Sequence, residues 1–453
     1  MKIAGASTAK EAYWRLYEVN DRLNCVVTAV EPAKEGIPIA LKDNISTKGI
    51  LTTACCRLLG DYIPVYDAHI VDKLDKAGFV CVAKANMDEL SMGGTNFSSA
   101  SGPCLNAYDP KRISGGSSGG SAVFVASGVV PVAIGTDTGD SIRRPASFNG
   151  VIGVKPTYGR ISRYGVIPYA SSLDHVGYFT TNVKDAAYML EVLAGRDDRD
   201  MTSSFAEVPS YSKLLDSDVR GKKILVLKNV TDAIENKELL RLFWNIIDDL
   251  KKRGAQVSKV TFDDRLMRAI FPVYYVIANA EAASNHADLN GISYGKRIDG
   301  ADHRDLMMKT RTAGFGPWIK KRLIIGSYAL FEENQERIFR RAQKIRRLIV
   351  DEVISKLKDA DALIAPTVPY IAPRIDEIDV NEVADEHLPA DNHLIIANFA
   401  GLPSMSLPMG FVDGMPVGIS VTANVFAEQQ MFDIAKAIEE YTGLEDLTVE
   451  DRL

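Results

Sequence analysis

A run of 24 residues without a charged side chain, 113–136, most constrains what this chain can fold into. It opens with SGGSSGGS at 114–121 and continues into an apolar segment, 122–126, that must be buried. The glycines allow close backbone approach and positive φ, and the serines supply hydroxyls without charge. The pattern predicts a Gly-Ser loop, a buried helix, a strand and a second serine-bearing loop at 135–141. Two such turns at one edge of a sheet are typical of a site in an α/β protein.

Strand-like and helix-like segments alternate along the chain. The predicted helices are one that starts at a capping box at 8–11, one that Asp67 caps and that runs to Gly78, and the segments 120–127 and 236–253. The predicted strands are 25–30, 79–83, 129–134, 224–227, 362–365 and 417–421. This alternation predicts an α/β fold with a mostly parallel sheet.

Domain boundaries are not marked by a repeat, a low-complexity tail or a Pro/Gly linker. We therefore expect one domain over residues 1–453. The segment 208–391 is more charged and more helical than its flanks, and we interpret it as an insertion within that domain, on the substrate side. Its stretch 330–359 interleaves arginines with acidic residues, which is typical of a solvated helix face.

Composition excludes several classes of protein. With 53 Lys+Arg against 59 Asp+Glu, the net charge is −6, so broad binding of a nucleic-acid backbone by this chain alone is not expected. No apolar run approaches the roughly 18 residues that a membrane span needs. The five cysteines have no zinc or disulfide spacing, and the first residues lack an apolar signal segment. A cytoplasmic protein without a metal is the expectation.

The Gly-Ser run has competing interpretations. A flexible linker would not lead into a buried apolar segment. A phosphate-binding loop would need Gly-Lys-Ser/Thr, which is absent. Gly115-x-Ser117-x-Gly119 matches the hydrolase nucleophile elbow in form, but the residues before it are a turn rather than a strand. A catalytic role remains open on these residues alone.

A serine nucleophile needs a base, and the six histidines offer none in a marked setting. His175, beside Asp174, is the strongest histidine candidate for a general base, although such a histidine is more often a structural residue. Lys42 is the alternative, at the end of an apolar strand that starts near Ile37. Its pKa would have to fall by about 3 units from about 10.4, or roughly 4 kcal/mol, which burial can supply. A lysine that merely extends from a strand end into solvent is the structural alternative.

Three segments together resemble the amidase signature family: LKDN at 41–44, GGSSGGS at 115–121 and DTGDSIR at 137–143. The 24-residue spacing of Ser117 and Ser141 suits the serine pair of that family. Further stretches at 86–89, 155–165 and 170–174 are similar to the branch of the family that supplies ammonia within tRNA-dependent amidotransferases. The resemblance covers nearly the whole chain and implies the amidase signature fold, a large mixed, mostly parallel central sheet covered by helices on both faces.

The resemblance implies a Ser-Ser-Lys triad that hydrolyses an amide through an acyl-enzyme. Ser141 would be the nucleophile, Ser117, in a cis peptide, would relay the proton, and Lys42 would be the neutral base. The oxyanion hole would consist of the backbone amides of Thr138, Gly139, Asp140 and Ser141.

Asp140 departs from the family pattern, which commonly has glycine there. Its amide is retained, but a carboxylate beside a developing oxyanion would be repulsive. We therefore expect the side chain to point away, towards Arg143 or Arg144.

Glutamine is the substrate that the branch implies, for converting Glu-tRNA(Gln) to Gln-tRNA(Gln). A zwitterion needs a cation for its carboxylate and an anion for its ammonium. The family match assigns these contacts to Arg322 and Asp391, with Tyr274 nearby, although Arg322 by itself resembles part of a solvated basic run.

The resemblance also implies partners. A kinase and tRNA-binding subunit would use ATP and Mg²⁺, and a small third subunit or its equivalent would complete a heterotrimer. The present chain would need no cofactor and would contact tRNA mainly through its partners, in the cytoplasm or, in a eukaryote, the mitochondrial matrix. Two other functions stay open: a free-standing amidase for a small amide, and a non-catalytic scaffold.

Overall fold

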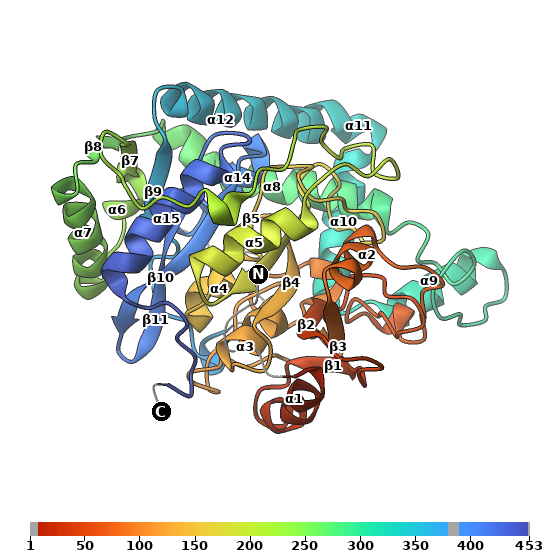
Figure 1. The fold of residues 1–453 in the computed structure, drawn as a ribbon. Coiled ribbons are helices and arrows are strands. Elements are labelled where there is room, and N and C mark those ends of the chain that lie inside the picture. The colour runs from red at the N-terminus through yellow and green to blue at the C-terminus, as the bar shows by residue number, and fades with distance from the viewer. Residues whose placement is uncertain (1–7, 379–388, 452–453) are drawn as a thin grey trace.

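The molecule is built on one large sheet (Figure 1). The structure, a computed structural model, describes residues 8–378 and 389–451. Within those ranges the sheet has 11 strands in the order β1-β3-β2-β4-β6-β5-β10-β11-β9-β7-β8. The strands are β1 Val26–Ala29, β2 Ile37–Lys42, β3 Phe79–Ala85, β4 Val132–Asp137, β5 Ile152–Lys155, β6 His175–Thr180, β7 Lys223–Leu227, β8 Gln256–Val260, β9 Ala362–Pro366, β10 Ser404–Val412 and β11 Met415–Thr422.

The expected mixed sheet is confirmed, and its parallel strands lie in two blocks. One block is β3-β2-β4 and the other is β9-β7-β8. Among the described residues the strands between these blocks pair antiparallel, so antiparallel pairs are more frequent than the strand–helix alternation suggests. Part of the reason is local, since β10 and β11 form a hairpin.

Each face of the sheet carries its own apolar core. In β2, Ile39 and Leu41 belong to one cluster of buried side chains and Ala40 belongs to another, and β4 alternates in the same way. Because successive side chains of a strand point to opposite faces, the two clusters lie on the two sides of the sheet. Residues of the helices α1 Ala9–Leu23, α3 Gly119–Ala126 and α4 Arg143–Asn149 join the Ala40 cluster. Residues of α2 His69–Lys76, α5 Val183–Leu193 and α15 Glu428–Thr442 join the other. Helices thus cover both faces, as expected.

The helices are α1 Ala9–Leu23, α2 His69–Lys76, α3 Gly119–Ala126, α4 Arg143–Asn149, α5 Val183–Leu193, α6 Lys228–Thr231, α7 Lys237–Lys252, α8 Asp264–Asn285, α9 His303–Gly314, α10 Pro317–Leu330, α11 Glu332–Asn334, α12 Arg341–Leu357, α13 Pro389–Asn392, α14 Ile395–Ala400 and α15 Glu428–Thr442. The capping box of the first helix is confirmed, with both reciprocal bonds between Thr8 and Glu11 present. The predicted cap of α2 is wrong. Asp67 instead accepts a hydrogen bond from the Lys48 amide at 2.7 Å, and α2 begins after Ala68 without a side-chain cap.

The chain between 264 and 357 is almost entirely helical and runs along the upper and right side of the molecule in Figure 1. The prediction that the arginines of 330–359 form a solvated helix face is only partly confirmed. Arg347 is exposed and pairs with Asp351, whereas Arg346 reaches inward and donates to Ser172 and to the Phe399 carbonyl. No helix in the described ranges is both long enough and apolar enough to span a bilayer.

Candidate active site

Lys42 ends β2 and is completely buried. Its amine nitrogen lies 2.7 Å from Ser117 Oγ, 2.9 Å from Ser118 Oγ and 2.9 Å from Thr136 Oγ1. Strand β2 is parallel to β4, so Lys42 and Thr136 lie at the carboxyl ends of neighbouring strands. The two serines enter the same space from the loop before α3. The structure therefore brings together Lys42 and Ser117, two of the three residues of the predicted triad.

Burial lowers the pKa of Lys42 to about 7. The buried carboxylates of Asp88, Asp137 and Asp174 act in the opposite sense, but loss of hydration is the larger effect. A lysine amine near pH 7 is thus partly neutral, which is the condition that a general base must meet. The alternative, in which Lys42 extends into solvent, is wrong.

The Gly-Ser loop is held by close backbone contacts. The peptide bond between Gly116 and Ser117 is cis, as expected. A β-carbon on Gly116 would lie 2.0 Å from Asp88 Oδ2, so only glycine fits there. Asp88 in turn accepts hydrogen bonds from the amides of Asn96 and Ser98, and its own amide donates to the Ser117 carbonyl at 3.2 Å. The loop that carries Ser117 is therefore fixed against the segment 86–98.

The second loop, 138–141, follows β4 directly. The Ser118 amide donates to the Ser141 carbonyl at 3.3 Å, so the backbones of the two loops touch. Within the described residues, none of the amides of Thr138, Gly139, Asp140 and Ser141 donates a hydrogen bond. Four unengaged donors in a row can bind an oxyanion. The Thr138 hydroxyl donates to Asp174 at 2.7 Å and fixes the start of the turn.

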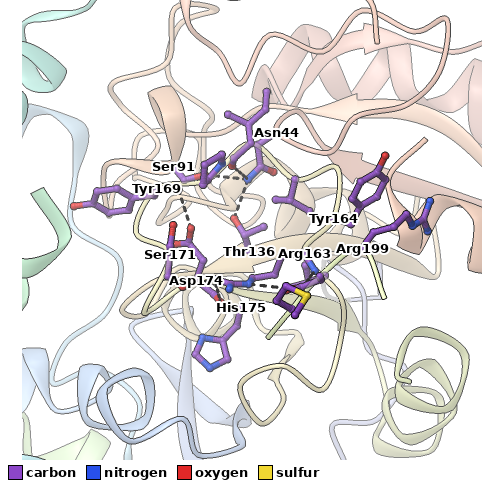
Figure 2. A pocket seen from close by; sticks show the side chains of 16 residues that line it. Asn44, Ser91, Thr136, Arg163, Tyr164, Tyr169, Ser171, Asp174, His175 and Arg199 are labelled. Atoms are coloured by element: carbon purple, nitrogen blue, oxygen red, sulfur yellow. Dashed lines mark hydrogen bonds and ion pairs between the residues drawn. The ribbon is translucent and has the colours of Figure 1, made fainter. Parts of the chain in front are cut away.

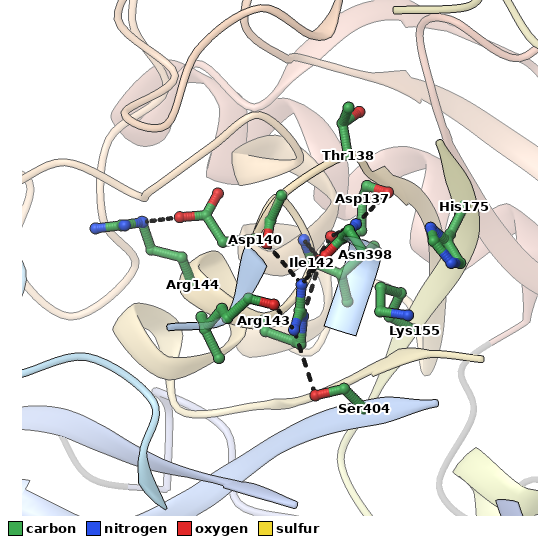
Figure 3. Close-up of polar contacts among 12 residues, drawn as sticks. Asp137, Thr138, Asp140, Ile142, Arg143, Arg144, Lys155, His175, Asn398 and Ser404 are labelled. Atoms are coloured by element: carbon green, nitrogen blue, oxygen red, sulfur yellow. Dashed lines mark hydrogen bonds and ion pairs between the residues drawn. The ribbon is translucent and has the colours of Figure 1, made fainter. Parts of the chain in front are cut away.

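A buried ion pair holds the end of this loop (Figure 3). Asp137 accepts hydrogen bonds from Arg143 Nε at 3.1 Å and Nη2 at 3.0 Å, and both side chains are fully buried. Burial opposes the charge of Asp137, but the Arg143 guanidinium outweighs it and holds the pKa of Asp137 well below its usual range. Arg143 also donates to the Gly139 carbonyl at 2.7 Å, and the Ile142 amide donates to Asp137. The loop is thereby bent around a fixed charge.

A cavity of about 160 Å³ opens beside the loop. Its polar lining residues include Asp88, Asp140, Arg144, Tyr274, Arg322 and Tyr370. A β-carbon on Gly139 would lie 3.1 Å from the Tyr274 ring, so Tyr274 packs directly on the oxyanion loop. The predicted contacts Tyr274 and Arg322 thus lie in one cavity with the predicted oxyanion loop.

Arg322 is not part of a solvated run. Its guanidinium lies over the Tyr275 ring and donates to the Tyr169 hydroxyl at 2.9 Å. Its Nε is buried without a hydrogen-bond partner, and no carboxylate pairs with it among the described residues. A half-buried guanidinium without a carboxylate partner among the described residues is a ready site for the carboxylate of a ligand.

Asp140 and Asp391 both form an ion pair with Arg144. Asp140 turns towards Arg144, at 2.5 Å from Nε, which confirms the expected direction. Asp391 does not line the cavity itself but contacts Arg144 at 3.0 Å and accepts from the Tyr370 hydroxyl at 2.8 Å. It therefore lies one side chain behind the cavity wall.

A second cavity of about 210 Å³ is lined by Thr136 (Figure 2). Asn44, Asp174 and His175 are among its lining residues. The candidate base His175 lies in β6, where its Nδ1 is 2.6 Å from the Leu173 carbonyl, and burial holds its pKa well below the usual value. His175 is thus a neutral, structurally bound residue, whereas Lys42 makes the contact with Ser117.

Sequence reasoning assigned no role to several residues that contact the site. Ser118 and Thr136 are hydrogen-bonded to Lys42, and Asn44 donates to Thr136 Oγ1 at 3.2 Å. Arg144 was expected only as a possible partner of Asp140, and its second contact, with Asp391, was not predicted. Their positions inside or next to the signature segments were the available signal. The contacts themselves depend on the fold, since Arg144 and Asp391 are separated by 247 residues.

Comparisons with known proteins agree with this geometry. The family Amidase matches residues 6–432. The A subunit of the glutamyl-tRNA(Gln) amidotransferase of Lactobacillus acidophilus is 41% identical, over 98% of this chain and 96% of its own length, and that of Koribacter versatilis is 43% identical over 90% and 85%. The crystal structure of the same protein from Thermotoga maritima superposes with a TM-score of 0.81 at 36% identity, covering 96% of this chain and 92% of that one. The chain therefore belongs to the amidase family.

Proposed function

We propose that this chain is the glutaminase subunit of a glutamyl-tRNA(Gln) amidotransferase. In this function it hydrolyses glutamine and delivers ammonia for the conversion of Glu-tRNA(Gln) to Gln-tRNA(Gln). The observation that carries the proposal is a single arrangement. An amine with a pKa of about 7 is bonded to a serine, next to a cavity lined by a guanidinium that has no carboxylate partner among the described residues. The relatives named above, matched over nearly their whole length, support it.

In the proposed reaction Ser141 Oγ attacks the carboxamide carbon of glutamine. Its proton passes to Ser117, whose own proton passes to the neutral amine of Lys42, 2.7 Å away. The carbonyl oxygen becomes an oxyanion that the amides of residues 138–141 bind, and such a donor is worth about 2.7–4 kcal/mol. The proton returns along the same path to the leaving nitrogen, ammonia departs, and water hydrolyses the acyl-enzyme to glutamate.

Recognition of glutamine follows from charge. The Arg322 guanidinium would bind the carboxylate of the substrate, because its Nε has no partner among the described residues. Asp391, which lies behind the cavity wall against the lining residues Arg144 and Tyr370, would supply the negative charge that attracts the ammonium. Tyr274, packed on Gly139, would close the cavity over the reacting carbon. An amide without these two charges gains nothing from such a cavity, which is why we propose an amino-acid amide.

Division of labour within the complex follows from the net charge of −6. A chain without an excess of basic residues is poorly suited to bind the tRNA backbone. We propose that a kinase partner binds the tRNA and uses ATP and Mg²⁺ to activate its glutamyl group, that a small third protein or its equivalent completes the complex, and that the assembly works in the cytoplasm.

The sharpest test reconstitutes the complex and compares two nitrogen sources, glutamine and ammonium chloride. Ser141→Ala should abolish glutamine-dependent formation of Gln-tRNA(Gln) and leave ammonium-dependent formation intact. Ser121→Ala is the matched control, because Ser121 is also a buried serine but its hydroxyl bonds the Ile134 carbonyl. Unchanged glutamine-dependent activity in Ser141→Ala would overturn the mechanism. Loss of both activities would overturn the proposal that this chain serves only to supply ammonia.

A further inference from the structure

Asp140 places a carboxylate in the turn that holds the four free amides. Its side chain is partly buried, and its only ion pair among the described residues is with Arg144. The pairing is doubled by the backbone, since the Arg144 amide donates to the Asp140 carbonyl at 2.9 Å. Figure 3 shows both side chains directed to one side of the loop, away from the Asp137–Arg143 pair. The carboxylate therefore sits beside the oxyanion loop together with its own counter-ion.

The other edge of the Arg144 guanidinium reaches a distant segment. Its Nη1 donates to the Tyr370 hydroxyl at 3.2 Å and to Asp391 Oδ1 at 3.0 Å, and its Nη2 donates to the Asp391 carbonyl at 3.2 Å. Asp140, Arg144 and Tyr370 all line the cavity that Arg322 also lines. A single guanidinium thus connects the oxyanion loop to α13.

The contacts of Arg144 with Asp140 and Asp391 have two electrostatic consequences. Negative charge develops on the substrate oxygen next to Asp140, so an uncompensated carboxylate there would raise the barrier of the reaction. The bonded guanidinium cancels that charge. The same guanidinium also fixes the position of Asp391 and attenuates its negative charge, so the strength of the ammonium site depends on how Arg144 is shared between the two carboxylates.

We propose that Asp140 and Arg144 form a mutually dependent positioning pair. Arg144 allows a carboxylate to occupy the oxyanion loop, and Asp140 in turn holds Arg144 so that Asp391 keeps enough negative charge to bind an ammonium. Neither side chain is catalytic, because each acts through another group, and the Asp140 backbone amide of the oxyanion loop is retained in every variant below. The inference rests on the proposed function for the identity of the substrate, glutamine.

The test is a double-mutant cycle on glutamine hydrolysis, with kcat and KM measured separately. Arg144→Gln leaves the Asp140 carboxylate uncompensated, and we expect kcat to fall at least 10-fold. In Asp140→Asn, Arg144 pairs with Asp391 alone and neutralises more of its negative charge. We therefore expect KM to rise about 3- to 10-fold with little change in kcat. The double variant, Asp140→Asn with Arg144→Gln, should regain kcat to within about 3-fold of wild type.

Rescue of kcat by a second substitution is not expected from a merely structural role. If the kcat loss of Arg144→Gln persists unchanged in the double variant, the charge compensation is wrong. Glutaric acid monoamide, which lacks the ammonium, tests the proposed effect of Asp140 on Asp391. With this substrate, Asp140→Asn should no longer raise KM. A KM rise of equal size for both amides would overturn the link to Asp391.

A third readout separates this inference from the proposed function. A small fluorophosphonate should label Ser141: the hydroxyl oxygen forms a bond to phosphorus, fluoride leaves, and the proton goes to Lys42. Labelling needs the oxyanion loop but no glutamine, so Arg144→Gln should slow it and the double variant should restore it, even if glutamine proves not to be the substrate. Labelling at equal rates in all four proteins would overturn the pair whatever the substrate.

Discussion

The amine of Lys42 lies 2.7 Å from the hydroxyl of Ser117, and both side chains are fully buried. The surrounding hydrogen bonds decide which of the two carries the shared proton. The Ser118 hydroxyl donates to the Thr136 carbonyl at 3.0 Å, so towards Lys42 it can only accept. Thr136 Oγ1 also takes an N–H from Lys42. A neutral amine has two N–H donors and one lone pair, which leaves the lone pair for the Ser117 proton.

The pH dependence of hydrolysis should therefore show one ascending limb. Burial lowers the pKa of Lys42 to about 7, so the amine is protonated and inactive below that pH and neutral above it. We expect kcat/KM for glutamine to rise about 10-fold per pH unit below 7 and to level off by about pH 8. A profile that is flat from about pH 5.5 to 7 would contradict the assignment of Lys42 as the base.

Removal of the Ser118 hydroxyl should impair catalysis by freeing an N–H of Lys42. In Ser118→Ala a buried donor loses its acceptor, which costs about 1–3 kcal/mol and destabilises the geometry of the amine. We expect kcat to fall about 10-fold with KM little changed. Ser121→Ala removes an equally buried hydroxyl three residues later that bonds the Ile134 carbonyl instead, and it should keep near-normal kcat. Equal losses in the two variants would show that Ser118 has no special role.

Arg322 should determine the affinity for the carboxylate of the substrate. Arg322→Met keeps much of the side-chain volume but removes the charge-assisted hydrogen bonds, worth about 1.5–3 kcal/mol. KM for glutamine should rise about 10- to 100-fold, whereas KM for glutamine methyl ester or another amide without the carboxylate should not. Lys320→Met, on the same helix α10 but outside the cavity, is the control. A similar KM rise for both amides would remove Arg322 from the carboxylate site.

Much of the active site could be predicted because its parts are local in sequence. Lys42 ends an apolar strand, and the Gly-Ser run and the loop 138–141 flank one buried helix and strand. Local patterns alone produced these features, and the resemblance then ordered them into a triad. Local sequence does not distinguish Arg322 from a solvated basic residue, and only the resemblance assigned it to the substrate. The fold adds that its guanidinium contacts Tyr169 and Tyr275 instead of extending into solvent.

The departures from prediction have a common physical origin in long-range contacts. Asp67 has the local pattern of a helix cap, yet the Lys48 amide, 19 residues earlier, takes its carboxylate. Strands β5, β6 and β10 were not among the predicted strands, and they form the antiparallel centre of the sheet. Their segments are short or contain glycine and proline, so packing between neighbouring strands rather than intrinsic propensity determines them.

Stability should depend strongly on the buried pair between Asp137 and Arg143. Removal of one partner leaves an unpaired buried charge, which costs about 3–5 kcal/mol. Arg143→Met should therefore lower the melting temperature by several degrees at pH 7. The difference in melting temperature between the variant and wild type should shrink at low pH. In wild type Arg143 holds the pKa of Asp137 well below its usual range, whereas in the variant Asp137 accepts a proton easily and its unpaired charge disappears. The control is Arg220→Met, whose exposed pair with Asp218 is largely hydrated and should leave the melting temperature unchanged. Equal melting temperatures for Arg143→Met and wild type would contradict a structural role for the pair.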